Sequence, residues 1–177
     1  MAYVFVESGG VWSQQAELVA SDGEPLDQFG DSVAVSGSTI VVGATKYYNG
    51  GPGAAYVFEY AKGTWKQQAE LTIANPQNLN DAFGSSVAID GSTILAGAPF
   101  STVNSKQYQG AAYTFVQNGN TWTRQTELTA SDGRAGDHFG VQVELSGSTA
   151  IVGAPCHPSQ DYLCTSRPAE PGASRRN

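Results

Sequence analysis

The sequence predicts an all-β fold made of repeated four-stranded antiparallel units, and three observations support this. A similar stretch of sequence occurs three times, beginning at Asp27, Asp81 and Asp137, and its middle copy covers residues 81–99. The tryptophans keep a similar interval, with 53 and then 57 residues between Trp12, Trp65 and Trp122. The chain also holds 21 glycines, one methionine and 10% aromatic residues, a composition typical of β-proteins with many turns. A fixed period of this length indicates a repeat architecture, in which each unit buries its apolar faces by stacking on the next.

The first half of each unit is predicted to form two strands joined by a tight turn. Residues 83–89 alternate, with Phe83, Val87 and Ile89 on one face and small residues on the other, which indicates a strand. Residues 90–93 (DGST) predict a turn, because glycine supplies the positive φ that tight hairpins need. The second strand, 93–98, is apolar on both faces, so we expect it to be covered on both sides.

The second half of each unit is predicted to form two further strands. Residues 53–58 (GAAYVF) and 110–115 (GAAYTF) form a third strand whose tyrosine and phenylalanine share one face. A short turn leads to a fourth strand, 65–72, in which we expect Trp65, Ala69 and Leu71 on one face. Its charged residues suit an outer edge, because they discourage pairing with another sheet.

Four-stranded antiparallel sheets that stack face to face around an axis form a β-propeller. Each unit has about 55 residues, and its central strands are apolar on both faces. We therefore predict a partial β-propeller of about three four-stranded antiparallel blades over residues 1–155. A linear stack and a two-sheet sandwich are the alternatives, although a sandwich does not require near-identical units.

Two short elements of the unit resemble the FG-GAP repeat, the blade of the integrin α-chain propeller and of bacterial proteins similar to it. Phe83-Gly84 is followed by Gly97-Ala98-Pro99, and the last unit repeats both elements at residues 139–140 and 153–155. The first unit departs only at Thr45, which stands in place of the proline. The resemblance covers residues 2–155 and is most similar to bacterial members. It implies an extracellular or cell-surface location and a role in adhesion or ligand binding.

The order of the predicted strands leaves both ends of the repeat array incomplete. The chain opens on strands three and four of a unit, runs through two full units and closes on strands one and two. Closed propellers usually have four to eight blades. We therefore expect either a homodimer that completes the ring or missing blades supplied by a longer parent protein. Met1 leads directly into a predicted strand without a signal peptide, which favours a fragment or an internal start.

Residues 156–177 differ in composition from the repeats. They contain no valine, isoleucine or phenylalanine, hold three prolines and end in Ser-Arg-Arg-Asn. We predict a disordered tail that is foreign to the repeat. Cys156 and Cys164 both lie in it, and the sequence does not say whether they pair.

The charge balance excludes some classes of partner. The formal net charge is −7, which repels phosphate backbones, so we expect no nucleic-acid partner. No apolar run reaches the ~18 residues that a membrane helix needs, so we expect no membrane insertion.

The aspartate that opens each copy of the repeat has a metal-binding and a structural interpretation. Asp27, Asp81 and Asp137 could line a cation site, but an aspartate before a strand also caps a turn, and we favour the cap. Integrin-type blades often carry an aspartate-rich loop between the two elements, whereas here that connection is four residues long. We predict no metal site and no cofactor, with weak calcium binding in the Asp22/Asp27 and Asp132/Asp137 loops as the open alternative.

The repeats show no constellation typical of catalysis. His138 stands where Gln28 and Ala82 stand in the other units, and neither histidine has a local nucleophile beside it. We therefore predict no catalytic residues and no enzyme. The repeated Gly43, Gly97 and Gly153 are expected where backbones approach closely near the axis. The tryptophans could stack on sugars, but their regular placement favours packing between blades.

The loops between the second and third strands vary while the scaffold repeats, so we place ligand binding there. The candidates are Tyr47, Tyr48, Asn49 and Tyr108, whose aromatic and amide groups suit a protein or glycan ligand. Solvated loop tips are the equally open alternative. We predict a non-catalytic extracellular recognition or adhesion module. The alternative is a set of scaffold blades within a larger secreted protein or enzyme.

Overall fold

The computed structural model describes residues 1–73 and 80–155, which form twelve strands and one short 3-10 helix. In chain order they are β1 (Ala2–Ser8), β2 (Val11–Leu18), β3 (Phe29–Ser36), β4 (Thr39–Ala44), η1 (Tyr47–Asn49), β5 (Ala54–Ala61), β6 (Thr64–Leu71), β7 (Val87–Asp90), β8 (Thr93–Ala98), β9 (Ala111–Asn118), β10 (Thr121–Leu128), β11 (Gln142–Ser146) and β12 (Thr149–Gly153). The prediction of a disordered tail at 156–177 lies outside the described residues.

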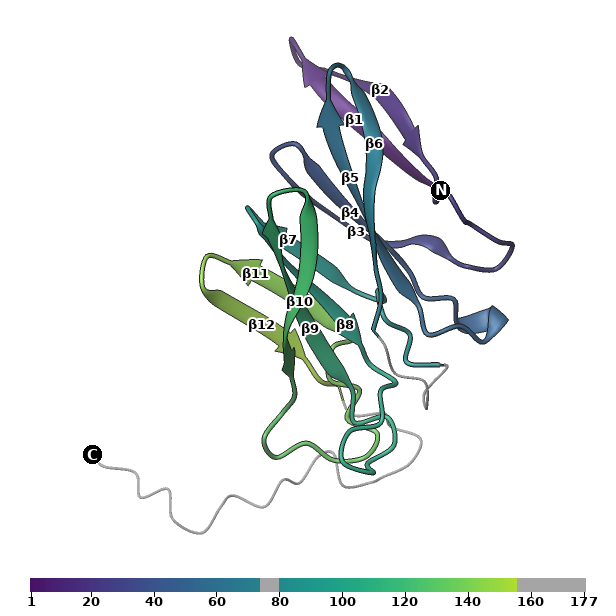
Figure 1. Ribbon diagram of the computed structural model, residues 1–177, viewed down its shortest axis with the longest axis vertical. Helices are drawn as coiled ribbons and strands as arrows, with labels where there is room; N and C mark the ends of the chain where they lie inside the picture. Colours follow the sequence, from purple (N-terminus) through teal and green to yellow (C-terminus); the bar gives the residue numbers. More distant parts are fainter. Residues whose placement is uncertain (74–79, 156–177) are drawn as a thin grey trace, which may run out of the picture.

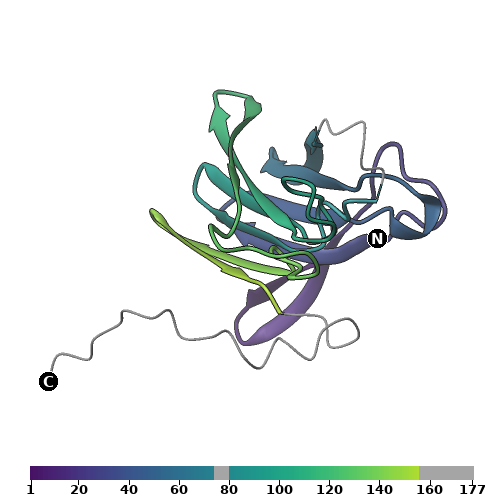
Figure 2. The ribbon, with the colours of Figure 1, turned by 90° about the horizontal axis from the view of Figure 1, so that it is seen from below.

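The strands form two complete four-stranded sheets and two half-sheets. The complete sheets are β3-β4-β5-β6 and β7-β8-β9-β10, and the half-sheets are β1-β2 and β11-β12. All pairs within them are antiparallel, and the sheets follow one another in chain order (Figure 1). Figure 2 shows the β7–β10 sheet between its two neighbours. The all-β fold and the partial β-propeller are confirmed.

Three apolar clusters hold the sheets face to face. The first includes Ile40, Val42 and Tyr56, against which Ala2 and Val4 of β1 pack. A second joins one face of the β3–β6 sheet to the β7–β10 sheet, and a third joins the other face of β7–β10 to β11 and β12. Each central strand is therefore covered on both faces by neighbouring sheets, as its apolar pattern predicts.

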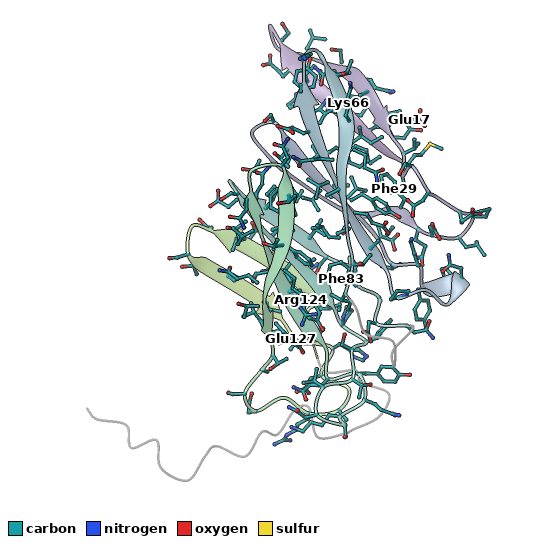
Figure 3. The ribbon with its side chains drawn as sticks, viewed as in Figure 1. Glu17, Phe29, Lys66, Phe83, Arg124 and Glu127 are labelled. Carbon is teal, nitrogen blue, oxygen red and sulfur yellow. The ribbon has the colours of Figure 1, made fainter. Side chains whose placement is uncertain are left out.

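Each complete sheet contains the same three aromatic rings. In the β3–β6 sheet, the ring of Phe29 lies 5.5 Å from Tyr56 and 6.1 Å from Phe58, measured between centroids. In the next sheet, Phe83 lies 6.0 Å from Tyr113 and 5.9 Å from the ring of Phe115. Figure 3 shows Phe29 and Phe83 at corresponding positions of consecutive sheets. The phenylalanine of the repeated Phe-Gly element thus packs the chain at or just before strand one of a sheet against strand three of the same sheet.

The first strand of the middle unit is shorter than the sequence predicts. It begins at Val87 and not at Phe83, because the chain bulges at Ser85. Gly84 N donates to Gly97 O and Gly97 N donates to Ser86 O, both at 2.9 Å, so Ser85 has no partner across the sheet. Gly84 supports this path with a φ of 83°, a conformation that glycine adopts without steric cost.

A second bulge corrects the predicted face of the fourth strand. Val57 pairs with Ala69 but the adjacent Phe58 pairs with Gln67, which leaves Gln68 without a partner across the sheet. The side chains beyond the bulge change face. Trp65 therefore packs towards the preceding half-sheet, whereas Ala69 packs towards the following sheet. The expectation that Trp65, Ala69 and Leu71 share one face is wrong for this reason.

The bulged glutamine binds the tryptophan of the following sheet. Trp65 Nε1 donates to Gln15 Oε1 of the preceding half-sheet at 2.8 Å, and Trp122 Nε1 donates to Gln68 Oε1 at 3.0 Å. Packing of these two tryptophans between blades is confirmed. Trp12 holds the same position in β2, but it is 68% exposed, because no described sheet precedes it.

The repeated glycine of the Gly-Ala-Pro element marks a close approach of two backbones. A Cβ atom added to Gly43 would lie 1.9 Å from Gly84 O, and one added to Gly97 would lie 1.9 Å from Gly140 O. Neither distance leaves room for a side chain, so the predicted backbone approach is confirmed at both positions. At Gly153 the nearest atom to an added Cβ would be 3.6 Å away, because no described sheet follows.

Candidate functional site

The strand ends that bear the longer loops carry the candidate site. In Figure 1 the tight hairpin turns lie at the upper left of the sheets, and the longer connections lie at the lower right. The connections come from β4–β5, from β8–β9 and from the segments that enter β3, β7 and β11. They vary in length and composition on a regular scaffold, which is the usual place for binding residues.

The aspartate of each repeat holds these connections in place. Asp27 Oδ2 accepts a hydrogen bond from Glu24 N at 2.9 Å, and Asp137 Oδ2 accepts one from Arg134 N at 2.7 Å. Asp81 is fully buried, and its backbone oxygen accepts a hydrogen bond from Phe100 N at 3.2 Å. A carboxylate that closes a turn in this way is a cap, so the geometry at Asp27 and Asp137 agrees with the structural interpretation.

The residue after each aspartate has an unusual backbone conformation. Gln28, Ala82 and His138 have φ values of 59°, 52° and 53°, in the left-handed region that residues other than glycine rarely adopt. Regular repetition of this conformation directs the three side chains to the same place in successive sheets. All three line one cavity.

The cavity has a volume of about 570 Å³, within the range of small-molecule sites. Residues from three consecutive units line the cavity, because equivalent positions of each unit lie on its walls. The lining residues are Gln28, Thr45, Tyr47, Ala82, Ser85, Pro99, Phe100, His138, Val141 and Pro155. Two of them, Ser85 and Val141, directly follow a Phe-Gly element, so the bulge at Ser85 places a residue in the cavity wall.

The polar groups of the cavity differ in how they are held. The Thr45 hydroxyl, which stands in place of the repeated proline, lies 2.9 Å from both Gln28 Oε1 and Asp31 Oδ2 and can donate to either. Ser85 Oγ is buried and makes no hydrogen bond within the described residues. A buried hydroxyl without a partner carries a desolvation cost, which a bound polar group would remove.

A row of aromatic rings runs from one unit to the next, and three of its members, Tyr47, Phe100 and His138, line the cavity. Tyr48 lies 5.5 Å from Tyr47, and Tyr47 lies 5.5 Å from Phe100, measured between centroids. Phe100 in turn lies 5.9 Å from Tyr108 and 5.4 Å from His138. The rings of Tyr108 and His138 are stacked at 6.2 Å. We call these five residues the aromatic row.

The sequence-predicted ligand residues fall into two groups. Tyr47, Tyr48 and Tyr108 belong to the aromatic row and keep about half or more of their surface exposed. Asn49 instead ties η1 to the scaffold, because its Nδ2 donates to Asp27 Oδ1. Binding by these residues stays a prediction, and Asn49 has a structural partner that competes with a ligand.

Sequence reasoning missed two residues of the row, Phe100 and His138. Both stand next to a repeated element at a position that changes between units, so the repeat pattern did not indicate a role for them. Their position was itself the available signal, because residues that flank a repeated turn share its location in space. Contacts between loops of different units are set by tertiary structure and leave no local pattern.

Two tyrosines between the sheets show perturbed acidity. Burial, with a contribution from the Glu127 carboxylate, raises the pKa of Tyr113 to about 12. Burial also raises the pKa of Tyr56 above its usual range, and the charge of Glu70 acts in the same direction. Both phenols are therefore neutral at physiological pH and belong to the core.

The loops proposed for weak calcium binding hold their carboxylates in other contacts. Asp22 accepts a hydrogen bond from the Tyr56 hydroxyl at 3.3 Å and lies 3.8 Å from Lys46 Nζ. Across residues 1–73 and 80–155, no group of three or more His, Cys, Asp or Glu side chains is arranged to hold a metal ion. The expectation of no metal site stays a prediction.

Comparison with protein families gives three matches to the FG-GAP repeat, at residues 12–58, 65–115 and 122–161. Together they cover most of the chain and follow the repeated units described above. A search of curated protein sequences found no match. None of the helices within the described residues has the length and apolar character to cross a membrane.

Proposed function

Because this chain belongs to the FG-GAP repeat family, we propose that it is a non-catalytic recognition module that binds a protein or glycan ligand through its loops. The observation that carries this proposal is the aromatic row, three members of which line the cavity. Its rings come from the loops of two different units and from the entry to a third. A surface built from several units needs the assembled sheets, which is why a regular scaffold with variable loops suits recognition.

The chemistry of the row favours contact with flat or apolar groups. Tyrosine offers a large, rigid face and one hydroxyl at a low cost in conformational entropy. Tyr48 is 69% exposed and therefore available at the outer end of the row. Prolines 99 and 155 line the same cavity together with Ser85, whose hydroxyl is buried. A ligand with one apolar face and one hydrogen-bonding group, such as a sugar ring or a tyrosine- or proline-containing peptide, fits this combination.

The contacts of His138 favour a binding role over a catalytic one. Its ring is stacked on Tyr108 and lies edge-on to Phe100, and its backbone N donates to Tyr108 O at 3.0 Å. These contacts make the imidazole part of the aromatic surface. The family is typical of extracellular proteins, and we place this module outside the cell or at its surface.

Binding can be tested by screening the 177-residue chain on a glycan array and against a phage-displayed peptide library, and by titrating the strongest hit. We expect Tyr48→Ala and Tyr108→Ala each to weaken that hit by about tenfold or more, as for central aromatic contacts. Tyr60→Ala is the matched control, since Tyr60 is an exposed tyrosine near a hairpin turn, away from the row.

Circular dichroism of each variant would show that the fold is retained. A hit whose affinity changes equally in the Tyr60 variant and the loop variants would contradict binding by the aromatic row. The absence of any hit from both libraries would instead favour scaffold blades of a larger protein.

A further inference from the structure

Two strand edges of the described chain lack the neighbour that their counterparts have. Strand two of each complete sheet pairs with strand three, as β4 does with β5 and β8 with β9. By contrast, β12 is a second strand that pairs only with β11, and β1 is a third strand that pairs only with β2. The half-sheet at one end therefore has the two strands that the half-sheet at the other end lacks.

We propose that β11-β12 of one copy and β1-β2 of a second copy form one composite four-stranded sheet. The pairing of strands two and three in the complete sheets predicts the register between β12 and β1 in this composite sheet. Val41 pairs with Val57 in the first complete sheet, and Leu95 pairs with Thr114 in the second. The equivalent residues at the open edges are Ile151 in β12 and Val4 in β1, so these two lie opposite each other across the joint.

The aromatic rings at the two ends support this pairing. Phe139 is the third copy of the core phenylalanine, but its own sheet has no strand three within the described residues. Tyr3 and Phe5 hold the positions of Tyr56 and Phe58, yet they are 50% and 53% exposed. Composite pairing places both rings beside Phe139 of the other copy. It completes the same three-ring contact that each full sheet already contains.

The tryptophan–glutamine contact supports the same joint independently. In the composite sheet, Trp12 follows the β7–β10 sheet of the other copy, whose bulged glutamine is Gln125. Gln125 is exposed and corresponds to Gln15 and Gln68, which accept hydrogen bonds from the tryptophan of the next sheet. Within the described residues, the indole of Trp12 and the amide of Gln125 thus lack the hydrogen bond that their counterparts make in two other places.

One residue at the joint opposes the packing. Ala34 and Ala88 face the sheet that follows them, and Glu144 stands at the equivalent position of β11. In the composite sheet Glu144 faces the exposed Val33 and Val35 of the other copy. A carboxylate there costs desolvation, so it weakens the joint without removing its other contacts.

Two copies joined at both ends contain six four-stranded sheets, within the range of closed propellers. Sedimentation velocity of the full chain at up to about 100 μM tests this directly. We expect a dimer whose dissociation constant rises by about tenfold or more in Tyr3→Ser/Phe5→Ser. The dissociation constant of the dimer should stay unchanged in Tyr48→Ser, which alters another exposed aromatic ring away from the joint.

Glu144→Ala should lower the dissociation constant of the dimer, because it places at this position the alanine that the other units have. Larger head-to-tail assemblies that the Tyr3/Phe5 variant dissolves would also support the proposal. Wild-type and Glu144→Ala chains that both stay monomeric at the highest concentration would overturn it. So would a dimer that the Tyr3/Phe5 variant leaves intact.

Disulfide cross-linking tests the register. In a background of Cys156→Ser/Cys164→Ser, the pair Val4→Cys/Ile151→Cys should give covalent dimers when oxidised with copper phenanthroline. The control pair Val4→Cys/Thr149→Cys lies two residues along the strand, about 7–8 Å away in a sheet, and should cross-link poorly. Equal yields from both pairs, or no dimer from either, would overturn the predicted joint.

Discussion

Inner and terminal copies of the same residue differ in burial although their sequences agree. Phe115 in β9 is 3% exposed, whereas Phe5, its counterpart in β1, is 53% exposed. Trp122 donates to Gln68 of the preceding sheet, whereas Trp12 has no described sheet before it. The local sequence is nearly constant, so the difference comes from the neighbours that Phe5 lacks within the described residues, namely strands one and two of its own sheet and the sheet before it. In this fold each strand pair is therefore stabilised both by the other strands of its sheet and by the interface with the adjacent sheet.

The largest expected difference is between Phe115→Ala and Phe5→Ala. Truncation of the buried ring removes its apolar contacts and leaves a cavity, so we expect a loss of about 3–5 kcal/mol in the free energy of unfolding. Truncation of the exposed ring should cost less than about 1 kcal/mol in dilute protein. Urea titrations of both variants measure this. Similar losses at low concentration would contradict the comparison.

The effects of Phe5→Ala and Phe115→Ala should also differ in how they depend on protein concentration. If copies associate through β1, the cost of Phe5→Ala should grow as the protein concentration rises, because association stabilises the folded chain by mass action. The cost of Phe115→Ala should not change in this way. Melting temperatures recorded over a range of concentrations distinguish the two.

A smaller difference is expected between Gly97→Ala and Gly153→Ala. The new methyl group at Gly97 would overlap Gly140 O of the following sheet, and a backbone atom cannot move aside without shifting that sheet. We expect a loss of about 1–3 kcal/mol, typical of overpacking. Gly153 meets nothing closer than 3.6 Å, so its variant should keep the wild-type melting temperature in dilute protein. A tolerated Gly97→Ala would show that the sheets separate more easily than the structure indicates.

The repeat made most of the fold predictable from the sequence. The period, the alternation in residues 83–89 and the glycine turns are local signals, and they predicted the sheets and their order. The two bulges were not predicted, because an extra residue in one strand depends on the partner strand. For this reason the start of β7 and the face of Trp65 were predicted wrongly.

Less of the candidate site could be predicted. Variable loops pointed to Tyr47, Tyr48 and Tyr108, which do lie in the aromatic row. Phe100 and His138 join the row through contacts between units, and sequence spacing does not encode those contacts. The amide of Asn49 is a group that suits ligand binding, but in the structure it donates a hydrogen bond to Asp27. Only the folded loop reveals this contact.

Alkaline pH should act on the buried tyrosine of an inner unit. The pKa of Tyr113 is raised to about 12 in the folded chain, whereas an unfolded tyrosine ionises near its usual value of about 10. The unfolded state therefore loses its proton first, and stability should fall from about pH 10 towards pH 12. Tyr113→Phe should flatten this decline in urea titrations at a series of pH values. An unchanged slope in that variant would assign the decline to other groups.

The smallest difference concerns the glutamines of the bulges. Gln68→Ala removes the acceptor of Trp122 Nε1 from a half-buried contact, which should lower the free energy of unfolding by about 0.5–1.5 kcal/mol. Gln125→Ala removes the equivalent side chain where the following half-sheet, β11-β12, has no fourth strand and so no tryptophan within the described residues, so it should have no measurable effect in dilute protein. The emission of the tryptophans would report the first change, since the indole of Trp122 loses its hydrogen bond. Equal effects from the two variants in dilute protein would show that the bulge, and not the contact with the following sheet, determines the role of the glutamine.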